Sequence, residues 1–212
     1  MSQKLIVFLR APILGHVKTR LAGAIDKNEA LNAYRCLVTQ LLQNLKSLPQ
    51  IELRFTPDAA RGELAPWALP GWTLVPQGDG NLGDRLARAF RHSFGEHHIN
   101  HTSKEANRVV IIGSDCPSIS VSDIESAWNC LLTKDIVLGP ARDGGYWLIG
   151  LRELHTELFV NIPWSTDSVL ETTLAGARKA GLKYHCLRTL ADVDTVEDWE
   201  DFKRSIRDPA SH

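Results

Sequence analysis

The stretch RVVIIGSDCP, residues 108–117, decides the fold. Its apolar run Val109–Ile112 contains four β-formers with no polar residue between them, which is typical of a strand buried on both faces. Such strands lie in parallel sheets that helices cover, so the run predicts the centre of an α/β domain. Asp115 follows directly where this strand ends, and a carboxylate there is costly unless a partner compensates its charge.

Segments of strand and helix character alternate on both sides of this run. Short apolar runs near proline or glycine predict strands, and apolar residues at helical spacing predict helices. Besides 108–113, the expected strands are Lys4–Arg10, Ile51–Thr56, Trp72–Val75, Asp135–Leu138, Tyr146–Leu151 and Lys183–Leu187. The expected helices are Asp26–Leu48, Asp84–Phe94, one through Leu132 that opens on a capping box of Ser122 and Glu125, Asp167–Lys179 and Thr195–Ile206. This order predicts an α/β fold with a mostly parallel sheet.

Composition narrows the class of protein. A chain of 212 residues, 43% of them hydrophobic, is enough for one sizeable core, so we expect a single domain over residues 1–212. The net charge of −1 argues against nucleic-acid and membrane partners, because neither would meet an attractive long-range field. The four cysteines form no C-x-x-C pair, and no apolar run has signal-peptide or membrane length. We therefore expect a cytoplasmic protein with reduced thiols.

Ligands of open α/β sheets bind outside the carboxyl ends of the strands, and the loop after the first strand carries basic residues there. In this loop, Ala11–Leu21, Gly15 allows the backbone to approach an anion, while Lys18 and Arg20 can donate charge-assisted hydrogen bonds to phosphate. The loop matches neither the Walker nor the G-x-G-x-x-G pattern. The alternative is a surface loop whose basic side chains are only solvated.

Asp115 is the strongest candidate for a metal ligand. A divalent cation that also bridges nucleotide phosphates would compensate a carboxylate at the end of a buried strand. The alternative is that Asp115 hydrogen-bonds its own turn, with Pro117 ending the segment.

Residues 139–147 form a third candidate segment. Gly144, beside Asp143, allows close approach of backbone to a ligand, and Tyr146 or Trp147 could wall a pocket. Asp-Gly is also a strong hairpin signal, and the two interpretations are compatible.

Two acids precede the last predicted helix. Asp192 and Asp194 would point the same way from an extended segment, which suits a shared cation. Equally, Asp194 or Thr195 could simply be the helix N-cap.

Two further features of the sequence can be explained without a functional role. The histidines of the polar segment Gly95–Asn107 and of the helix before it lack the H-E-x-x-H spacing, so an exposed loop is expected rather than a zinc site; they are His92, His97, His98 and His101. Trp164 either covers an acceptor or packs beside Pro163.

These segments in this order resemble the nucleotide-diphospho-sugar transferase superfamily of GT-A-like fold. Within it the chain is most similar to a bacterial branch described as glycosyltransferase-like or as molybdopterin- or phospholactate-guanylyltransferase-like. The resemblance runs from Ala11-Pro12 and Gly15-x-Val17-Lys18-Thr19-Arg20-Leu21, through residues 113–117, to Asp192-Val193-Asp194-Thr195. It implies a Rossmann-like, three-layer α/β/α domain with a mixed, mostly parallel sheet.

The resemblance also implies a binding site. It assigns nucleotide binding to the first loop and to the glycine-rich segment 77–85, and Mg²⁺ or Mn²⁺ binding to acids. Together with the turn at 143–144, which is a candidate from its own residues, the expected nucleotide-binding residues are Ala11, Pro12, Gly15, Lys18, Arg20, Gly83, Arg85, Asp143 and Gly144. Those implied to hold the metal are Asp115, Asp194 and Asp192, and those implied to be catalytic are Lys18, Arg20 and Asp115.

The implied activity is metal-dependent transfer from a nucleoside triphosphate or a nucleotide-sugar to a small-molecule acceptor. Glycosyltransferases of this fold usually present D-x-D, where this chain has only Asp115. Nucleotidyltransferases usually open with G-x-x-x-R-[MF]-G, of which only Gly15 and the basic residues remain. Nucleotidyl transfer is slightly favoured over glycosyl transfer, and a non-catalytic nucleotide-binding module is a third hypothesis. Base, acceptor and oligomeric state, a homodimer included, stay open.

Overall fold

The computed structural model describes residues 2–95 and 108–207 of the chain. The expected exposed loop at Gly95–Asn107 falls almost entirely outside these residues, and so do His97, His98 and His101.

One mixed sheet forms the middle of the protein, with strand order β3-β2-β1-β4-β6-β5-β7. Adjacent strands run parallel except at β6, which pairs antiparallel with both β4 and β5. The predicted mostly parallel sheet is therefore confirmed. The strands are β1 (Gln3–Arg10), β2 (Ile51–Thr56), β3 (Thr73–Pro76), β4 (Arg108–Ile112), β5 (Ile136–Pro140), β6 (Tyr146–Leu151) and β7 (Tyr184–Cys186).

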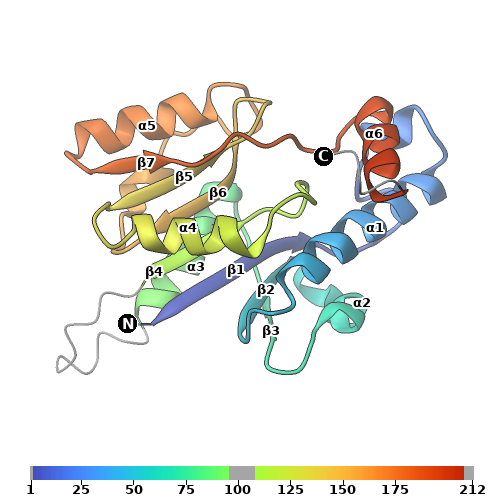
Figure 1. Cartoon of the computed structure of the whole chain (residues 1–212), viewed down its shortest axis with the longest axis horizontal. Helices are drawn as coiled ribbons and strands as arrows, with labels where there is room; N and C mark the ends of the chain where they lie inside the picture. The colour runs from blue at the N-terminus through green and yellow to red at the C-terminus, as the bar shows by residue number, and fades with distance from the viewer. Residues whose placement is uncertain (1, 96–107, 208–212) are drawn as a thin grey trace.

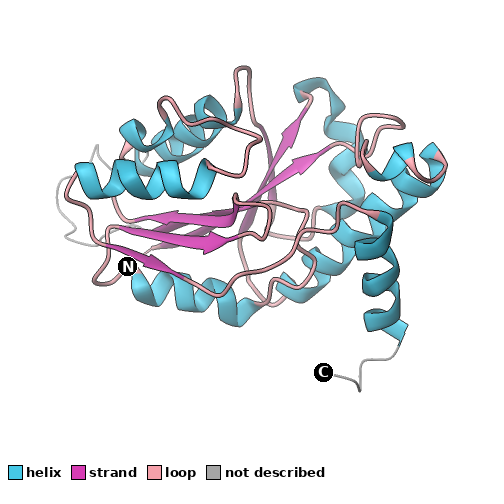
Figure 2. Cartoon of the chain, turned by 90° about the horizontal axis from the view of Figure 1, so that it is seen from above, coloured by secondary structure: helices cyan, strands magenta, loops and turns pink. Residues whose placement is uncertain are grey.

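Helices cover both faces of this sheet (Figures 1 and 2). Buried side chains of α1 and α4 pack in one core, and those of α3 and α5 pack in a second core on the other face. The α-helices are α1 (Lys27–Leu45), α2 (Arg61–Leu64), α3 (Leu82–Gly95), α4 (Val121–Cys130), α5 (Val169–Lys179) and α6 (Val196–Arg207). The result is the predicted three-layer α/β/α arrangement. Within the two described ranges, no helix combines the length and apolar character that crossing a bilayer requires.

The two central strands explain why the sequence reads as apolar there. In β1, Leu5, Val7 and Leu9 contribute to the core under α1 and α4, whereas Ile6 and Phe8 contribute to the opposite core. The run Val109–Ile112 of β4 divides between the two cores in the same alternating way. Side chains of successive strand residues point to opposite faces, so both faces of a central strand must be apolar.

The start of α4 differs from the prediction. Its capping box joins Ser120 and Asp123, not Ser122 and Glu125, so the helix begins at Val121. Both pairs have the required spacing, but Asp123 is buried and bonded to Arg188, whereas Glu125 is exposed. Tertiary contacts therefore decide between two caps that are locally equivalent.

Tyr34 of α1 joins the helix layer to the end of the sheet that carries the candidate site. Its buried hydroxyl donates to the Arg10 carbonyl oxygen at 2.8 Å and accepts from the Arg10 N–H at 2.9 Å. Burial raises the pKa of Tyr34, so the phenol stays protonated and can donate. The last residue of β1 is thereby fixed beyond its ladder with β2.

We expect Tyr34→Phe to lower the free energy of unfolding by about 1–2 kcal/mol, because both Arg10 backbone groups lose their partner in a half-buried position. Urea unfolding followed by circular dichroism measures this difference. Unchanged stability would show that water replaces the hydroxyl without penalty.

Candidate active site

A cleft of about 630 Å³ opens at the carboxyl ends of the parallel strands. Its lining residues lie at the ends of β1 and β2, in the loop after β1, on α1, directly after β3 and β4, at the start of α3, and in two later loops. The lining consists of Phe8, Leu9, Arg10, His16, Val17, Lys18, Thr19, Arg20, Tyr34, Thr56, Gln77, Gly80, Asn81, Leu82, Arg85, Gly113, Ser114, Asp115, Trp164, Ser165 and Asp194. The cleft therefore lies at the edge of the sheet where ligands of open α/β folds bind.

Lys18 is the central charge of this cleft. Its ammonium lies 2.5 Å from a carboxylate oxygen of Asp115 and 3.1 Å from one of Asp194, while only 3% of the side chain is exposed. Burial by itself would lower the pKa of Lys18, but the two carboxylates outweigh it and hold the pKa above its usual value. Lys18 is therefore charged at neutral pH. Arg20 adds a more exposed cation, 3.5 Å from Asp194.

The backbone at Lys18 is itself unusual. Its φ angle is +45°, in the left-handed region that β-carbon atoms disfavour. Val17 before it and Leu21 after it are both buried, so the loop is pinned to the core on either side. Non-glycine residues in this region are sterically strained and often lie at functional sites.

Asp194 reaches Lys18 because its neighbour caps the last helix. The hydroxyl of Thr195 accepts from the Asp198 N–H at 3.2 Å, and the Asp198 carboxylate accepts from the Thr195 N–H at 2.9 Å. The predicted choice between cap and site is thus resolved: Thr195 caps α6, and Asp194 faces the cleft. Just before it, the Val193 N–H donates to the Asp115 carbonyl oxygen at 3.1 Å, which joins the two acidic segments directly.

The opposite wall is built around Gln77 and the start of α3. The buried Gln77 amide donates to the carbonyl oxygens of Leu9 and Arg54, tying this wall to β1 and β2. Asn81 and Asp84 bond each other's backbone N–H groups in a reciprocal cap of α3. Arg85 follows in the first turn and bonds the Gly80 carbonyl oxygen. A helix N-terminus with an arginine beside it suits an anion.

Gly83 acts through packing. A Cβ atom at this position would lie 2.7 Å from the Phe159 carbonyl oxygen and 2.9 Å from Nε1 of Trp164. Trp164 can therefore lie against α3 only because residue 83 is glycine. The indole also makes an edge contact with Tyr146, at 6.4 Å between ring centroids, and lines the cleft. Both interpretations of Trp164, packing and covering a ligand, are thus compatible with its place.

The predicted site residues divide into two groups. Lys18, Arg20, Arg85, Asp115 and Asp194 come together in the cleft lining. Ala11 and Pro12 are buried behind the first loop, and Gly15 forms an exposed turn with φ +77° just before His16. Of this loop, residues 16–20 face the cleft and residues 11–15 shape it.

Asp143 and Gly144 lie in the hairpin between β5 and β6, outside the described lining of the cleft. The Asp143 carboxylate accepts from the Gly145 N–H at 2.9 Å, and Gly144 has φ +87°. A Cβ atom on Gly144 would collide with the Asp167 backbone, so glycine is needed for close packing of two loops. The hairpin interpretation explains this turn.

Asp192 also lies outside that lining, against the buried thiol of Cys116. The thiol donates to the Asp192 carboxylate at 2.6 Å. Burial, with help from the nearby Asp115, Asp143 and Asp194 carboxylates, raises the pKa of Asp192 to about 6. Asp192 and Asp194 therefore differ in environment, although they were expected to point the same way.

Two cleft residues that the sequence analysis did not single out are Arg10 and Thr56. Neither belongs to a recognisable motif. A signal was present nonetheless: each is the last residue of a strand or the first residue after one. Inspecting every strand end would have found them.

The pKa of Asp192 leads to a pH prediction. The pKa of the Asp192 carboxyl is about 6 in the native state and near the usual 3.8 in the unfolded chain, so the native state binds more protons between these values. Stability should therefore fall as pH rises from about 4 to 6. In Asp192→Asn this part of the fall, on the order of 2 kcal/mol, should vanish. Urea unfolding at pH 4.5 and 7 tests it, and an unaltered pH dependence would contradict the assignment.

We expect Gly83→Ala to displace Trp164 and to destabilise the protein by about 1–3 kcal/mol, because neither contact of the added methyl group is with a freely mobile atom. Tryptophan fluorescence should change along with the urea midpoint. As a control, Gly62→Ala should leave the fluorescence unchanged and should not lower the urea midpoint, since a Cβ atom there meets nothing within 4 Å and alanine is favoured over glycine in a helix. Equal behaviour of the two variants would refute the packing role.

Known proteins resemble this chain in fold and, in part, in sequence. Residues 40–166 match the family described as "Uncharacterized protein conserved in bacteria (DUF2064)". A crystal structure of a proposed nucleotide-diphospho-sugar transferase from Desulfovibrio desulfuricans G20 is 32% identical, with a TM-score of 0.87 over 100% of this chain and 90% of that chain. No curated protein matches the sequence.

More distant structures share the fold alone. A proposed glucose-1-phosphate thymidylyltransferase from Bacillus anthracis is 12% identical, with a TM-score of 0.55 over 98% of this chain and 96% of that chain. The 4-diphosphocytidyl-2C-methyl-D-erythritol synthase of Anaerococcus prevotii DSM 20548 is 10% identical, with a TM-score of 0.57 over 97% and 96%. The family match and the 32% identical relative confirm the superfamily resemblance inferred from the sequence: the chain belongs to the DUF2064 family and is a transferase of the nucleotide-diphospho-sugar transferase superfamily.

Proposed function

We propose that this protein is a divalent-metal-dependent nucleotidyltransferase that transfers the nucleotidyl group of a nucleoside triphosphate to a small-molecule acceptor and releases pyrophosphate. The observation that carries the proposal is the Lys18 ammonium, held at 2.5 Å and 3.1 Å by two carboxylates in a cleft of about 630 Å³. Pockets of a few hundred Å³ accept ligands of nucleotide size. A buried cation beside two carboxylates suits a reaction in which negative charge builds up on a phosphate leaving group.

The residues present fit a Mg²⁺ or Mn²⁺ ion. Asp115 and Asp194 supply hard carboxylate oxygens on one side of the cleft, where one oxygen of each already contacts the Lys18 ammonium, and 48% of the Asp115 side chain is exposed. Over the described ranges, no group of three or more His, Cys, Asp or Glu side chains forms a complete protein site. Mg²⁺ is commonly held by one or two carboxylates together with substrate phosphates, which is the arrangement proposed here. Asp192 contributes indirectly: its carboxylate accepts a hydrogen bond from the thiol of Cys116, the residue after Asp115.

Each basic group then has a task in the transfer. The acceptor oxygen forms a bond to the α-phosphorus, the bond from that phosphorus to the bridging oxygen breaks, and pyrophosphate leaves with the electron pair. Lys18 and Arg20 donate to the phosphate oxygens on which this charge builds. Arg85 and the N-terminus of α3 hold further phosphate oxygens from the opposite wall. The bound cation would offset the same charge as a Lewis acid.

Leu82 and Trp164 give the cleft an apolar side. Leu82 is 44% exposed at the first position of α3, and Trp164 packs next to it over Gly83. We assign this side to the ring of the acceptor or of a transferred sugar, since flat apolar surfaces pack well on rings. The four free cysteines are consistent with a cytoplasmic enzyme.

Glycosyl transfer from a nucleotide-sugar is the second candidate. The same cation and basic residues would then stabilise a nucleoside diphosphate as the leaving group, and the apolar side would hold the sugar. The single acid at the end of β4, Asp115 without a D-x-D pair, favours the nucleotidyl reaction. The third hypothesis, a non-catalytic nucleotide-binding module, would not explain why these charged residues of the cleft occur together.

The test compares wild type with Asp115→Asn and Lys18→Met. Both variants should lose metal-dependent binding and at least about 100-fold of the transfer rate, because charge stabilisation in the cleft is removed. Thermal shift with four nucleoside triphosphates and with nucleotide-sugars, with and without Mn²⁺, reports binding. Pyrophosphate release in the presence of sugar phosphates reports nucleotidyl transfer.

A matched control is Asp201→Asn, because Asp201 pairs with Arg204 on an exposed face of α6 and should be neutral. A larger metal-dependent shift with nucleotide-sugars than with triphosphates would replace nucleotidyl by glycosyl transfer. Unchanged binding and turnover in Asp115→Asn would remove the proposed site altogether.

A further inference from the structure

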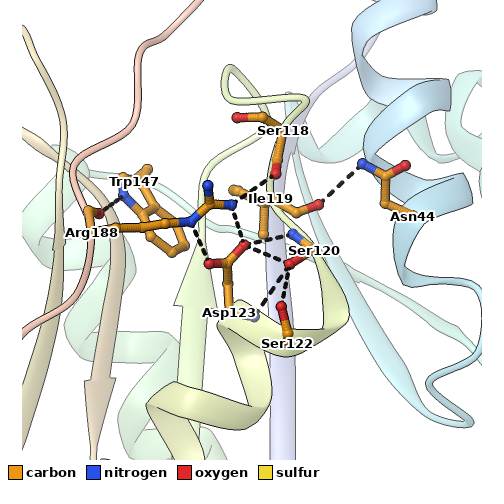
Figure 3. Close-up of polar contacts among 8 residues, drawn as sticks. All are labelled: Asn44, Ser118, Ile119, Ser120, Ser122, Asp123, Trp147 and Arg188. Atoms are coloured by element: carbon orange, nitrogen blue, oxygen red, sulfur yellow. Dashed lines mark hydrogen bonds and ion pairs between the residues drawn. The ribbon is translucent and has the colours of Figure 1, made fainter. Parts of the chain in front are cut away.

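Arg188, six residues before Asp194, is bound to the start of α4 through two nitrogen atoms of its guanidinium group (Figure 3). Its Nε atom donates to one oxygen of Asp123 at 2.7 Å, and Nη2 donates to the other at 2.8 Å. Nη2 also reaches the Ser118 carbonyl oxygen at 3.3 Å. One side chain therefore holds both the first turn of α4 and the loop that joins this helix to β4.

Asp123 joins Arg188 to the N-terminal cap of α4. The same carboxylate accepts from the Ser120 N–H at 2.9 Å and from its hydroxyl at 2.8 Å. Its side chain is only 8% exposed. Although burial opposes ionisation, Arg188 and Ser120 hold the pKa of Asp123 below its usual value, so the pair is charged at neutral pH.

The backbone of Arg188 is anchored as firmly as its side chain. Its carbonyl oxygen accepts from Nε1 of Trp147 at 3.2 Å. The Trp147 ring in turn lies so close over Gly139 that a Cβ atom on this residue would overlap it. The C-terminal segment is thus fastened to the sheet at the point where Arg188 reaches out to α4.

The loop that carries Asp115 is held from two further directions. On the α1 side, the Asn44 amide donates to the carbonyl oxygens of Pro117 at 2.8 Å and Ile119 at 3.1 Å. On the C-terminal side, Val193 donates to Asp115 itself at 3.1 Å. The segments 113–120 and 188–194 are therefore joined at both of their ends, by Arg188 at one and by Val193 at the other.

We propose that Arg188 is a positioning residue: by clamping segment 188–194 to the loop 113–120, it sets the spacing between Asp115 and Asp194. This inference rests on the proposed function, in which these two acids hold the metal ion. Arg188 is not among the residues that line the cleft, and it acts through Asp123, Ser118 and its own backbone.

Loss of Arg188 should change the positions of Asp115 and Asp194 more than it changes the stability of the folded protein. The Arg188 side chain is 54% exposed, so solvent screens its charge. The buried Asp123 carboxylate keeps its two hydrogen bonds from Ser120 when Arg188 is replaced, so we expect only a modest loss of stability. The two parallel hydrogen bonds of Arg188 nevertheless fix an orientation that a lysine cannot reproduce. Residues that orient metal ligands from a distance typically change metal affinity by about 10–100-fold when removed.

The experiment compares wild type with Arg188→Met, Arg188→Lys and a control, Arg178→Met. Arg178 is 50% exposed and pairs with Glu171 at 2.8 Å on α5, so it matches Arg188 in exposure and charge but clamps no loop. Amide hydrogen exchange over 113–120 and 188–194 is measured on the protein alone. Mn²⁺ affinity in the presence of inorganic pyrophosphate is measured by electron paramagnetic resonance.

Arg188→Met should speed exchange in both segments together and weaken Mn²⁺ binding by about 10-fold, with a Tm within about 2 °C of wild type. Arg188→Lys should recover only part of the affinity, and Arg178→Met should match wild type. Wild-type exchange and affinity in Arg188→Met would overturn the inference, as would an affinity loss that Arg178→Met shares. Absence of Mn²⁺ binding in wild type would instead overturn the proposed function and the metal role, while exchange would still show whether Arg188 holds the two segments.

Discussion

The buried Lys18 ammonium between Asp115 and Asp194 is the constraint on which the site end of the molecule depends. A charge with 3% of its side chain exposed is stable only if opposite charges accompany it, so three loops must meet at one point. They come from the end of β1, the end of β4 and the segment before α6, and the sequence separation of Lys18 and Asp194 is 176 residues. The C-terminal segment therefore has to return across the sheet to the first loop, where Val196 and Trp199 of α6 pack beside Leu21.

The sheet makes this meeting possible because it places strand ends side by side. β1 and β4 are hydrogen-bonded neighbours at the centre of the order, so the loops that follow them open into the same cleft. Polar side chains outside the chemistry then fix these ends: Tyr34 holds the last residue of β1, Gln77 ties β1 to β2, and Asn44 holds the loop after β4. Groups that act on phosphates gain most when they are held in position beforehand, and this second layer of contacts supplies that rigidity.

Local pattern was enough to predict most of the fold. Ile51–Thr56, in which apolar residues alternate with Glu52 and Arg54, and the largely apolar Tyr146–Leu151 both have the predicted bounds, because segments of strand length and strand pattern leave little choice of register. The predicted cap of α4 was wrong because Ser120 and Ser122 each precede an acid by three residues. The contact of Asp123 with Arg188 is what distinguishes the observed cap from the predicted one. Within the site, Lys18, Arg20, Asp115 and Asp194 could be predicted from their place after strands and before a helix. Their ion pairs could not, and neither could the separation of Asp192 from Asp194 nor the packing role of Gly83, since all three depend on which loops the tertiary fold brings together.

The central claim is that Asp115 and Asp194 hold a divalent cation against the phosphates of a nucleotide, with Lys18 beside them. A crystal grown with Mn²⁺ and a nucleoside triphosphate, with anomalous scattering measured at the manganese edge, tests this most directly. The account predicts one anomalous peak within about 2.3 Å of a carboxylate oxygen of each acid and of a phosphate oxygen, with the triphosphate along residues 16–20. A nucleotide bound with its phosphates away from Lys18, or a manganese peak elsewhere on the protein, would contradict it.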